Sequence, residues 1–435
     1  MKIMTSFFFS CLFYQSVFAA EAVDTFLTKS EEGQWTVEYR LIKPGSKIAF
    51  LRNPNDARVK RWKPVSSDFM IEYIDNHEFI KRRDNSVFSQ VSFVLEPSYT
   101  PLPKDYAPFS PFSDGGMLVH DGRFFACVEE CDLDVDYRWN MELRVPELEH
   151  ILVNGKIYAS NASWQGNNSG SYIYVGNQES IDSQHVIALI DRQLPKELKN
   201  ALSNRLPKMM DYFVSKFGKV YEKPSLFASY EKVNHEGVST QGGVLPNQIF
   251  MHWSGLDLEK HVKNEIFRND MVWFFAHEVA HLYQKENSYS TDSNHAWLHE
   301  GGADKFALEA LKSLNPELDD YYQYRLDKFK KKCRNGVMDT SLNEATKNKK
   351  FKLHYNCGFL IHHSIDKLVR DRFPHGDGIF DVWIEYKNQI KSGETAGKDT
   401  YFKIVTKFTD EDYVSLLEGF IVDSRKHIDK LIGTL

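Results

Sequence analysis

The spacing of hydrophobic residues changes near residue 190, and this change limits the possible folds more than any other feature of the chain. Before it, segments such as 34–41 (QWTVEYRL) and 171–175 (SYIYV) show the alternation, or the β-branched and aromatic residues, typical of strands. After it, apolar residues recur at helical spacing in most of the chain, beginning at 194–217. We therefore predict an α+β protein, with an antiparallel β domain over residues 21–190 and a helix-rich domain over residues 191–435.

The first 20 residues (MKIMTSFFFSCLFYQSVFAA) have the features of a secretory signal peptide. One lysine precedes an apolar stretch from Phe7 to Phe18, and small residues follow it. This stretch is shorter than the about 20 apolar residues that a membrane-spanning helix needs. We therefore predict that residues 1–20 are removed and that the protein is exported, to the periplasm or outside the cell, without a membrane anchor.

The charge balance excludes one class of partner. Lysine and arginine residues number 54 against 60 aspartate and glutamate residues, which gives a formal net charge of −6. A chain with this balance has no overall positive field that would draw it to nucleic acid or to anionic lipid. We therefore expect no nucleic-acid partner.

Four cysteines remain when Cys11, inside the predicted signal peptide, is set aside. They are Cys127, Cys131, Cys333 and Cys357. An even number of cysteines in an exported chain favours disulfides, and their spacings fit no zinc motif well. Pairing Cys127 with Cys131 and Cys333 with Cys357 is the simplest of the three connectivities that four cysteines allow.

The segment 277–281 (HEVAH) carries the chemistry of the helical region. Residues four apart on a helix lie on one face, so the imidazoles of His277 and His281 can reach one ion, with Glu278 beside it. Glu300 follows His281 after eighteen residues and completes a His, His, Glu set, which leaves a fourth position for water. We therefore predict one Zn²⁺ ion held by these three residues, with Glu278 as the general base.

Two other interpretations of this segment stay open. A buried helix without metal would need hydrogen-bond partners for two histidines and a glutamate. A structural zinc site would need a fourth protein ligand, for which His295 and His299 are near in sequence.

Asp304 lies one helical turn after Glu300, and we expect it to accept the second ring N–H of His277 or His281.

The HEVAH segment and residues 297–307 (WLHEGGADKFA) together resemble the gluzincin metallopeptidases of the alanyl-aminopeptidase type, and they are similar to the glycyl-aminopeptidase relatives of that family. The family combines HExxH, an eighteen-residue gap and a WLxEGxA-like segment, and the residues named above match its zinc ligands and general base. The resemblance implies a thermolysin-like catalytic domain over residues 191–435 and a peptide substrate. It is strongest over residues 240–360.

A tyrosine downstream of the zinc ligands is a further element of the family, where it stabilises the oxyanion from a YxxG-type segment. Residues 355–358 (YNCG) fit that segment, so the resemblance implies that Tyr355 has this role. Cys357 replaces the lysine that is usual there. If Cys357 pairs with Cys333, the disulfide would brace the helix that carries Tyr355.

A GxMEN strand precedes the zinc helix in the family; it lines the substrate, and its glutamate holds the free N-terminal amine. Residues 243–247 read GVLPN, so Gly243 and Asn247 match, but Pro246 stands where the glutamate should be. Proline offers neither a carboxylate nor an N–H group, and the amine anchor is missing from its usual place. The backbone of Gly242 and Gly243 can still pair with an extended substrate, as an edge strand does.

The interpretation that these features favour is an exported zinc metallopeptidase, aminopeptidase-like in lineage. One alternative is a zinc endopeptidase, or another hydrolase, that does not anchor an N-terminal amine. A further alternative is a zinc-binding protein without turnover. Members of the family usually continue into a large helical C-terminal domain, whereas the catalytic domain needs most of the residues after Glu300 here. We therefore expect a compact two-domain form with a more open cleft.

Overall fold

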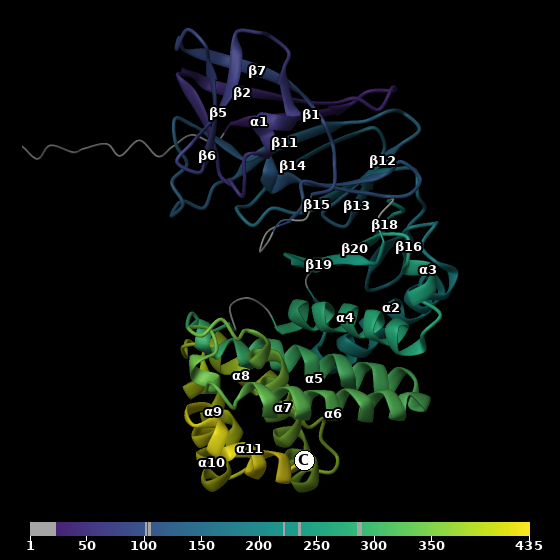
Figure 1. Cartoon of the computed structure of the whole chain (residues 1–435), viewed down its shortest axis with the longest axis vertical. Coiled ribbons are helices and arrows are strands. Elements are labelled where there is room, and N and C mark those ends of the chain that lie inside the picture. The colour runs from purple at the N-terminus through teal and green to yellow at the C-terminus, as the bar shows by residue number, and fades with distance from the viewer. Residues whose placement is uncertain (1–22, 101, 103–105, 221, 234–235, 285–288) are drawn as a thin grey trace, which may run out of the picture.

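Strands dominate one end of the molecule and helices the other, with a further sheet between them (Figure 1). This computed structural model describes residues 23–100, 102, 106–220, 222–233, 236–284 and 289–435. The predicted signal peptide, residues 1–20, lies outside the described residues. In the part of the chain that is described, no helix is both long enough and apolar enough to cross a membrane.

The N-terminal strands form three sheets. Their bounds, with one short helix among them, are β1 (Asp24–Lys29), β2 (Trp35–Gly45), β3 (Lys47–Phe50), α1 (Ala57–Arg61), β4 (Trp62–Pro64), β5 (Phe69–Ile74), β6 (His77–Arg82), β7 (Phe88–Leu95), β8 (Phe109–Pro111), β9 (Met117–His120), β10 (Ala126–Val128), β11 (Trp139–Arg144), β12 (His150–Val153), β13 (Lys156–Tyr158), β14 (Asn161–Gly166) and β15 (Tyr172–Gly176). The strand orders are β14-β11-β1-β2-β7-β4, β10-β3-β6-β5 and β13-β12-β15-β9-β8. All pairs in these sheets are antiparallel except β1 with β11, which are parallel.

The alternation in the sequence explains these strands. Every second residue of β2 from Trp35 to Leu41 is buried, and the residues between them are more exposed. This is the two-residue period of a strand with one face on the core. The predicted N-terminal antiparallel β domain is therefore confirmed, apart from the one parallel pair.

The sheet in the middle of the molecule is mixed. It consists of β16 (Ile181–Asp182), β17 (Ile187–Ile190), β18 (Ser225–Glu231), β19 (Ser239–Leu245) and β20 (Gln248–Ser254), in the order β16-β17-β18-β20-β19. β17, β18 and β20 run parallel, and β19 is an antiparallel edge strand. Because β17 precedes residue 190 and pairs with β18, this sheet draws on both sides of the predicted domain boundary, which stays a prediction.

Helices form the rest of the chain. Their bounds are α2 (Lys196–Phe217), α3 (Leu258–His261), α4 (Glu265–Gln284), α5 (Ala296–Leu314), α6 (Asp319–Gly336), α7 (Lys352–Arg372), α8 (Ile379–Lys391), α9 (Lys398–Phe408), α10 (Glu411–Val422) and α11 (Ser424–Gly433). The last apolar stretch of helical spacing, over residues 410–431, is divided between two helices, α10 and α11. They separate at Asp423, whose side chain accepts a hydrogen bond from the backbone N–H of Lys426 and caps α11.

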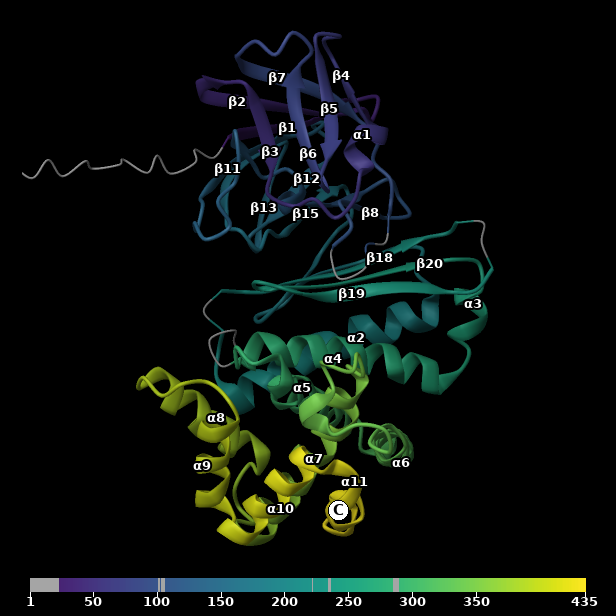
Figure 2. The same ribbon diagram turned by 60° about the vertical axis from the view of Figure 1, so that its left-hand side comes forward.

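The middle sheet has a different neighbour on each face (Figure 2). On one face, Leu226 and Met251 belong to the large core that includes Phe275 of α4. On the other face, Phe227 and Phe250 pack with aromatic residues of β15. The side chain of Gln248 also exchanges two hydrogen bonds, of 2.7 and 2.8 Å, with the backbone of Tyr172 in β15. The strand-rich part is therefore attached to the sheet that covers α4.

Helices α5 and α7 cross at two glycines. A Cβ atom on Gly301 would overlap the backbone carbonyl carbon of Gly358, and one on Gly358 would overlap the carbonyl oxygen of Trp297. Only the hydrogen of glycine fits this backbone contact. Glu300 precedes Gly301, and Tyr355 lies about one turn before Gly358, so the crossing brings these two side chains to the same region.

Two disulfides join the four cysteines in the simplest of the three pairings. Cys127 is bonded to Cys131 in the strand-rich part, and Cys333 at the end of α6 is bonded to Cys357 in α7. The second bond ties α6 to the helix that carries Tyr355, as expected if Cys357 pairs with Cys333.

We expect Gly301→Ala to lower the free energy of unfolding by about 2 kcal/mol, because the new methyl group meets backbone atoms that cannot rotate away. Urea unfolding followed by circular dichroism measures this loss. Gly433→Ala in α11 is the matched control, because nothing lies within 4 Å of a Cβ atom there. Equal stability of the two variants would contradict the close packing of α5 and α7.

Candidate metal centre

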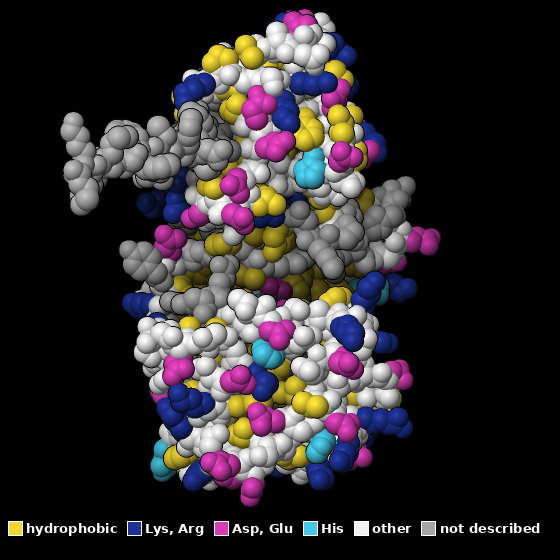
Figure 3. All heavy atoms as spheres, turned by 90° about the vertical axis from the view of Figure 1, so that its left-hand side faces the viewer, with side chains coloured by type: hydrophobic (Ala, Val, Ile, Leu, Met, Phe, Trp, Pro, Cys, Tyr) yellow, Lys and Arg dark blue, Asp and Glu magenta, His cyan; other side chains and the backbone are white. Residues whose placement is uncertain are grey.

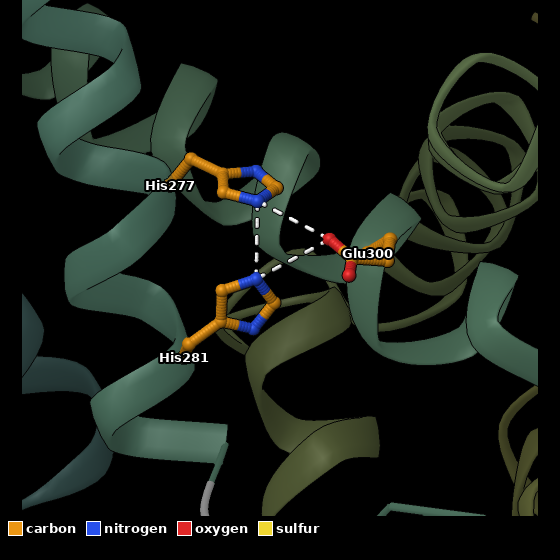
Figure 4. A group of neighbouring side chains, drawn as sticks. All are labelled: His277, His281 and Glu300. Carbon is orange, nitrogen blue, oxygen red and sulfur yellow. Dashed lines mark hydrogen bonds and ion pairs between the residues drawn. The ribbon is translucent and has the colours of Figure 1, made fainter. Parts of the chain in front are cut away.

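Three side chains from two helices point at one position (Figure 4). His277 and His281 lie one turn apart on α4, and Glu300 is in the second turn of α5 rather than the first. The Nε2 atoms of the two histidines are 3.0 Å apart. Oε2 of Glu300 is 3.3 Å from Nε2 of His277 and 3.4 Å from Nε2 of His281. Elsewhere in the described ranges, no other His, Cys, Asp or Glu side chains converge in this way.

The second ring nitrogen of each histidine has its own partner. Nδ1 of His277 is 2.7 Å from Oδ1 of the buried Asp304, and a carboxylate only accepts, so the ring N–H donates to it. Nδ1 of His281 is 2.8 Å from Oε1 of Gln284. The amide nitrogen of Gln284 donates to the carbonyl oxygen of His299 at 2.9 Å, which orients its oxygen toward His281. Each imidazole is therefore protonated on Nδ1, and in its neutral form it carries a lone pair on Nε2.

When both imidazoles are neutral, two lone pairs and a carboxylate thus converge on one point. The arrangement is repulsive unless a cation lies among the three groups. Nitrogen and oxygen ligands of a tetrahedral zinc ion lie about 3.3 Å from one another. The three separations of 3.0, 3.3 and 3.4 Å are close to this value, and a His, His, Glu set suits zinc. The residues present therefore fit a divalent metal ion.

Neither histidine considered as a fourth ligand belongs to the converging group. Nδ1 of His295 is 3.0 Å from the hydroxyl of Ser290. The ring of His299 stacks on Tyr289 with centroids 4.3 Å apart, and burial lowers the pKa of His299 to about 4. A group of three protein ligands leaves a position for water or substrate.

Negative charge is in surplus around the centre. Burial alone lowers the pKa of His277, but Asp304 and Glu300 outweigh it and raise this pKa well above the ordinary value. Burial raises the pKa of Glu300, but His277 and His281 outweigh it and lower this pKa. Burial also raises the pKa of Glu278, and the two histidines offset only part of that rise. A site of this charge attracts a cation, and Glu278 is a stronger proton acceptor than an exposed glutamate.

Tyr355 lies beside this group. Its ring is nearly parallel to that of His277, with centroids 5.8 Å apart. Burial, followed by the charges of Glu300 and Asp304, raises the pKa of Tyr355 above its ordinary value. The phenol therefore keeps its proton at neutral pH and is available as a hydrogen-bond donor.

Strand β19 is the edge of the middle sheet, and Gly242 places it close to α4. A Cβ atom on Gly242 would lie 2.8 Å from the ring of Phe274, which is on α4 just before His277. A Cβ atom on Gly243 would lie 3.3 Å from the ring of Tyr106. Figure 3 shows that the molecule is hollowed between its strand-rich and helix-rich parts, with hydrophobic side chains inside the hollow.

The third residue predicted to bind substrate lies elsewhere. Pro246 and Asn247 form the two-residue turn between β19 and β20, and Asn247 has a φ of 58°. The side chain of Asn247 donates to the carbonyl oxygen of Lys223 at 3.3 Å. Among the described residues, no contact joins Asn247 to the three converging side chains. A turn that needs positive φ explains this Asn without reference to substrate.

Gln284 is the residue of the centre that the sequence analysis missed. It lies three residues after His281, a spacing at which helical side chains meet. The three-residue spacing between His281 and Gln284 could therefore have identified this contact from the sequence of one helix. The neighbours of His299 were less accessible to sequence reasoning, because they depend on how the chain returns to α5.

Comparison with family models and with curated proteins finds no match to this chain. Comparison with solved structures does find matches. An aminopeptidase N family protein from Idiomarina loihiensis has a TM-score of 0.68 and 13% identity, over 92% of this chain and 76% of that chain. Yeast LTA4 hydrolase in complex with bestatin has a TM-score of 0.51 and 11% identity, over 92% of this chain and 67% of that chain. The chain thus shares the mixed α+β architecture of an aminopeptidase N family protein, with the strands first and the helices after them.

We expect Asp304→Asn to weaken zinc binding by about 10- to 100-fold, because the charged acceptor that holds His277 is lost. Competition with a fluorescent zinc chelator measures the affinity. Asp371→Asn, at an exposed position near the end of α7, is the matched control and should bind zinc like the unmodified protein. An unchanged affinity in Asp304→Asn would show that this contact does not orient the ligand.

Proposed function

We propose that the protein is a zinc-dependent hydrolase of peptide bonds, with His277, His281 and Glu300 as the metal ligands. One observation carries the proposal: the Nε2 atoms of two histidines and a carboxylate oxygen of Glu300 converge at separations of 3.0, 3.3 and 3.4 Å, which fit three ligands of one zinc ion. The buried carboxylate of Glu278 couples electrostatically to all three. The fold adds support, because the structure from Idiomarina loihiensis is of an aminopeptidase N family protein.

Each residue has a role in this proposal. Bound zinc would acidify a water molecule and polarise the peptide carbonyl group. Glu278 accepts a proton from water and passes it to the leaving amine, a task that suits a carboxylate of raised pKa. Tyr355 donates a hydrogen bond to the carbonyl oxygen as negative charge develops on it. The edge of β19 at Gly242 and Gly243 pairs with the extended peptide.

A second candidate function is cleavage that does not require a free N-terminus. The observation that favours it is the composition of β19, which contains no acidic residue (STQGGVL). Pro246, at the position of the family's glutamate, is in the turn after the strand and has no charge to offer an amine. An endopeptidase, or another hydrolase that ignores the amine, fits this strand better than a strict aminopeptidase does.

Export is part of the proposal. Disulfides persist in oxidising compartments and are rare in the cytosol, and this chain has two of them. Together with the signal-like residues 1–20, they support a protein that acts in the periplasm or outside the cell.

We expect Glu278→Gln to keep its zinc and to lose hydrolysis on the order of 1000-fold, because the variant lacks the proton acceptor but no metal ligand. Zinc content by atomic emission and digestion of a peptide library measure the two properties. Glu265→Gln, exposed at the start of α4, is the control and should retain both. A zinc-loaded unmodified protein that cleaves no peptide would instead favour a zinc-binding protein without turnover.

The second candidate predicts a small effect of blocking the N-terminus. We expect kcat/KM for acetylated and free peptides of one sequence to differ by less than about tenfold, whereas the loss of a charge-assisted anchor costs on the order of 100-fold. Mass spectrometry of both digests also locates the cleaved bond. Cleavage confined to the first bond of free peptides would establish an aminopeptidase and remove this candidate.

A further inference from the structure

A cavity lies against the metal centre on the side of Tyr355. Its volume is about 420 Å³, which is within the range of pockets that bind small ligands. Helices α4, α5, α6 and α7 supply its lining: Trp273, Asp304, Arg325, Lys328, Phe329, Lys332, Lys352, Tyr355 and Asn356. Tyr355 and Asp304 also contact His277, so this cavity lies next to the converging side chains.

Four cationic side chains line this cavity. Arg325 and Lys328 share Asp270, with N–O distances of 3.1 and 3.8 Å. Lys332 and Lys352 make no ion pair with any described residue. Burial and the neighbouring positive charges of Lys328, Arg325 and Lys352 lower the pKa of Lys332, so these cations act on one another. Positive charge here exceeds what the protein itself neutralises.

Two N–H donors at the cavity also lack partners. Nε of Arg325 and Nε1 of Trp273 are buried and make no hydrogen bond within the described chain. They are held in place, because the guanidinium of Arg325 lies 3.5 Å above the ring centre of Trp273. The guanidinium of Arg325 is thus fixed at the wall of the cavity, where its positive charge adds to those of the lysines.

The acidic groups nearby are already engaged. Asp270 is paired with Arg325, and Oδ1 of Asp304 accepts the ring N–H of His277. The lining itself contains one carboxylate, Asp304, against four cations, so the lining is net positive. The apolar faces of Trp273 and Phe329 complete the cavity, which suits an anion carried on a short apolar stem.

We propose that this cavity binds a carboxylate group of the peptide substrate, either an aspartate or glutamate side chain or the C-terminal carboxylate. The inference rests on the proposed peptide hydrolysis and names the substrate class: peptides with a carboxylate close to the cleaved bond. Lys332 and Lys352 supply the unpaired charge, and Arg325, held against Trp273, adds a positive charge beside it. The preference weakens as salt is added, because the two lysines are exposed to solvent.

The test uses matched peptides that differ only in charge. One series places a single glutamate at each position of an alanine pentapeptide in turn, and a matched series places a glutamine at the same positions. Each peptide is made with a free C-terminal acid and with a C-terminal amide. For the zinc-loaded protein, we expect kcat/KM to be about tenfold higher for the carboxylate member of at least one matched pair. A preference between glutamate and glutamine peptides indicates a side-chain carboxylate, and a preference between acid and amide peptides indicates the C-terminal carboxylate.

The lysines are tested together. Lys332→Gln/Lys352→Gln should reduce this preference about tenfold, and Lys332→Arg/Lys352→Arg should retain it, because charge and not packing is recognised. Lys331→Gln and Lys350→Gln, exposed neighbours outside the cavity, are controls that should leave the preference unchanged. No preference in the unmodified protein, or an equal preference in the double glutamine variant, would overturn the carboxylate site.

Binding without turnover separates this inference from the proposed function. Calorimetry with the zinc-loaded Glu278→Gln variant gives the affinity of each peptide directly. If the unmodified protein cleaves no peptide but this variant binds the carboxylate member more tightly through Lys332 and Lys352, the hydrolase proposal fails and the cavity assignment holds. If peptides are cleaved but binding ignores the carboxylate, the assignment fails and the hydrolase proposal stands.

Discussion

The backbone contact between Gly301 and Gly358 sets the position of the groups on α5 and α7. It lets the two helices approach until only hydrogen atoms separate them, and it places Glu300 and Tyr355 on the same side of the crossing. A buried ion pair also joins these two helices: Nζ of the fully buried Lys305 on α5 lies 2.8 Å from the carboxylate of Asp366 on α7. A charge buried this deeply is stable only with a partner, so α5 and α7 cannot slide past each other without exposing or orphaning it.

The same crossing distributes charge on α5. Glu300 and Asp304 are one turn apart and both reach α4, where they contact the histidines, whereas Lys305 points toward α7. The helix thereby presents negative charge to the metal centre and keeps its buried positive charge on the other side. This separation explains why His277 has a strongly raised pKa although it is buried. Without a metal ion, a proton on His277 balances the negative charge of Glu300 and Asp304, and a bound metal ion would take the place of that proton.

Local patterns in the sequence predicted most of the fold and the three side chains that converge on one point. The four-residue spacing of His277 and His281 needs only one helix to bring both rings together, and the change of periodicity near residue 190 separates strands from helices. What the sequence left undecided depended on contacts between distant segments. Asp304 had two candidate partners until the crossing of α4 and α5 was known, and Asn247 matched a motif by its letter while its backbone served a turn. The cationic cavity combines residues of α4, α5, α6 and α7, which no single segment could have shown.

The two ends of the site differ in the charge that they offer a peptide. On β19, where the family resemblance implies an acidic anchor for an amine, the chain has Gly242, Gly243 and then a proline turn. On α6 and α7, beyond Tyr355, it has lysines without counter-ions. An enzyme that holds a peptide by its amine needs negative charge at the first place, and one that holds it by a carboxylate needs positive charge at the second. Under the two proposals, this protein holds its peptide by a carboxylate at α6 and α7, whereas the family holds the N-terminal amine at the strand that corresponds to β19. The three proposed metal ligands lie between these two places and keep the geometry that cleavage requires.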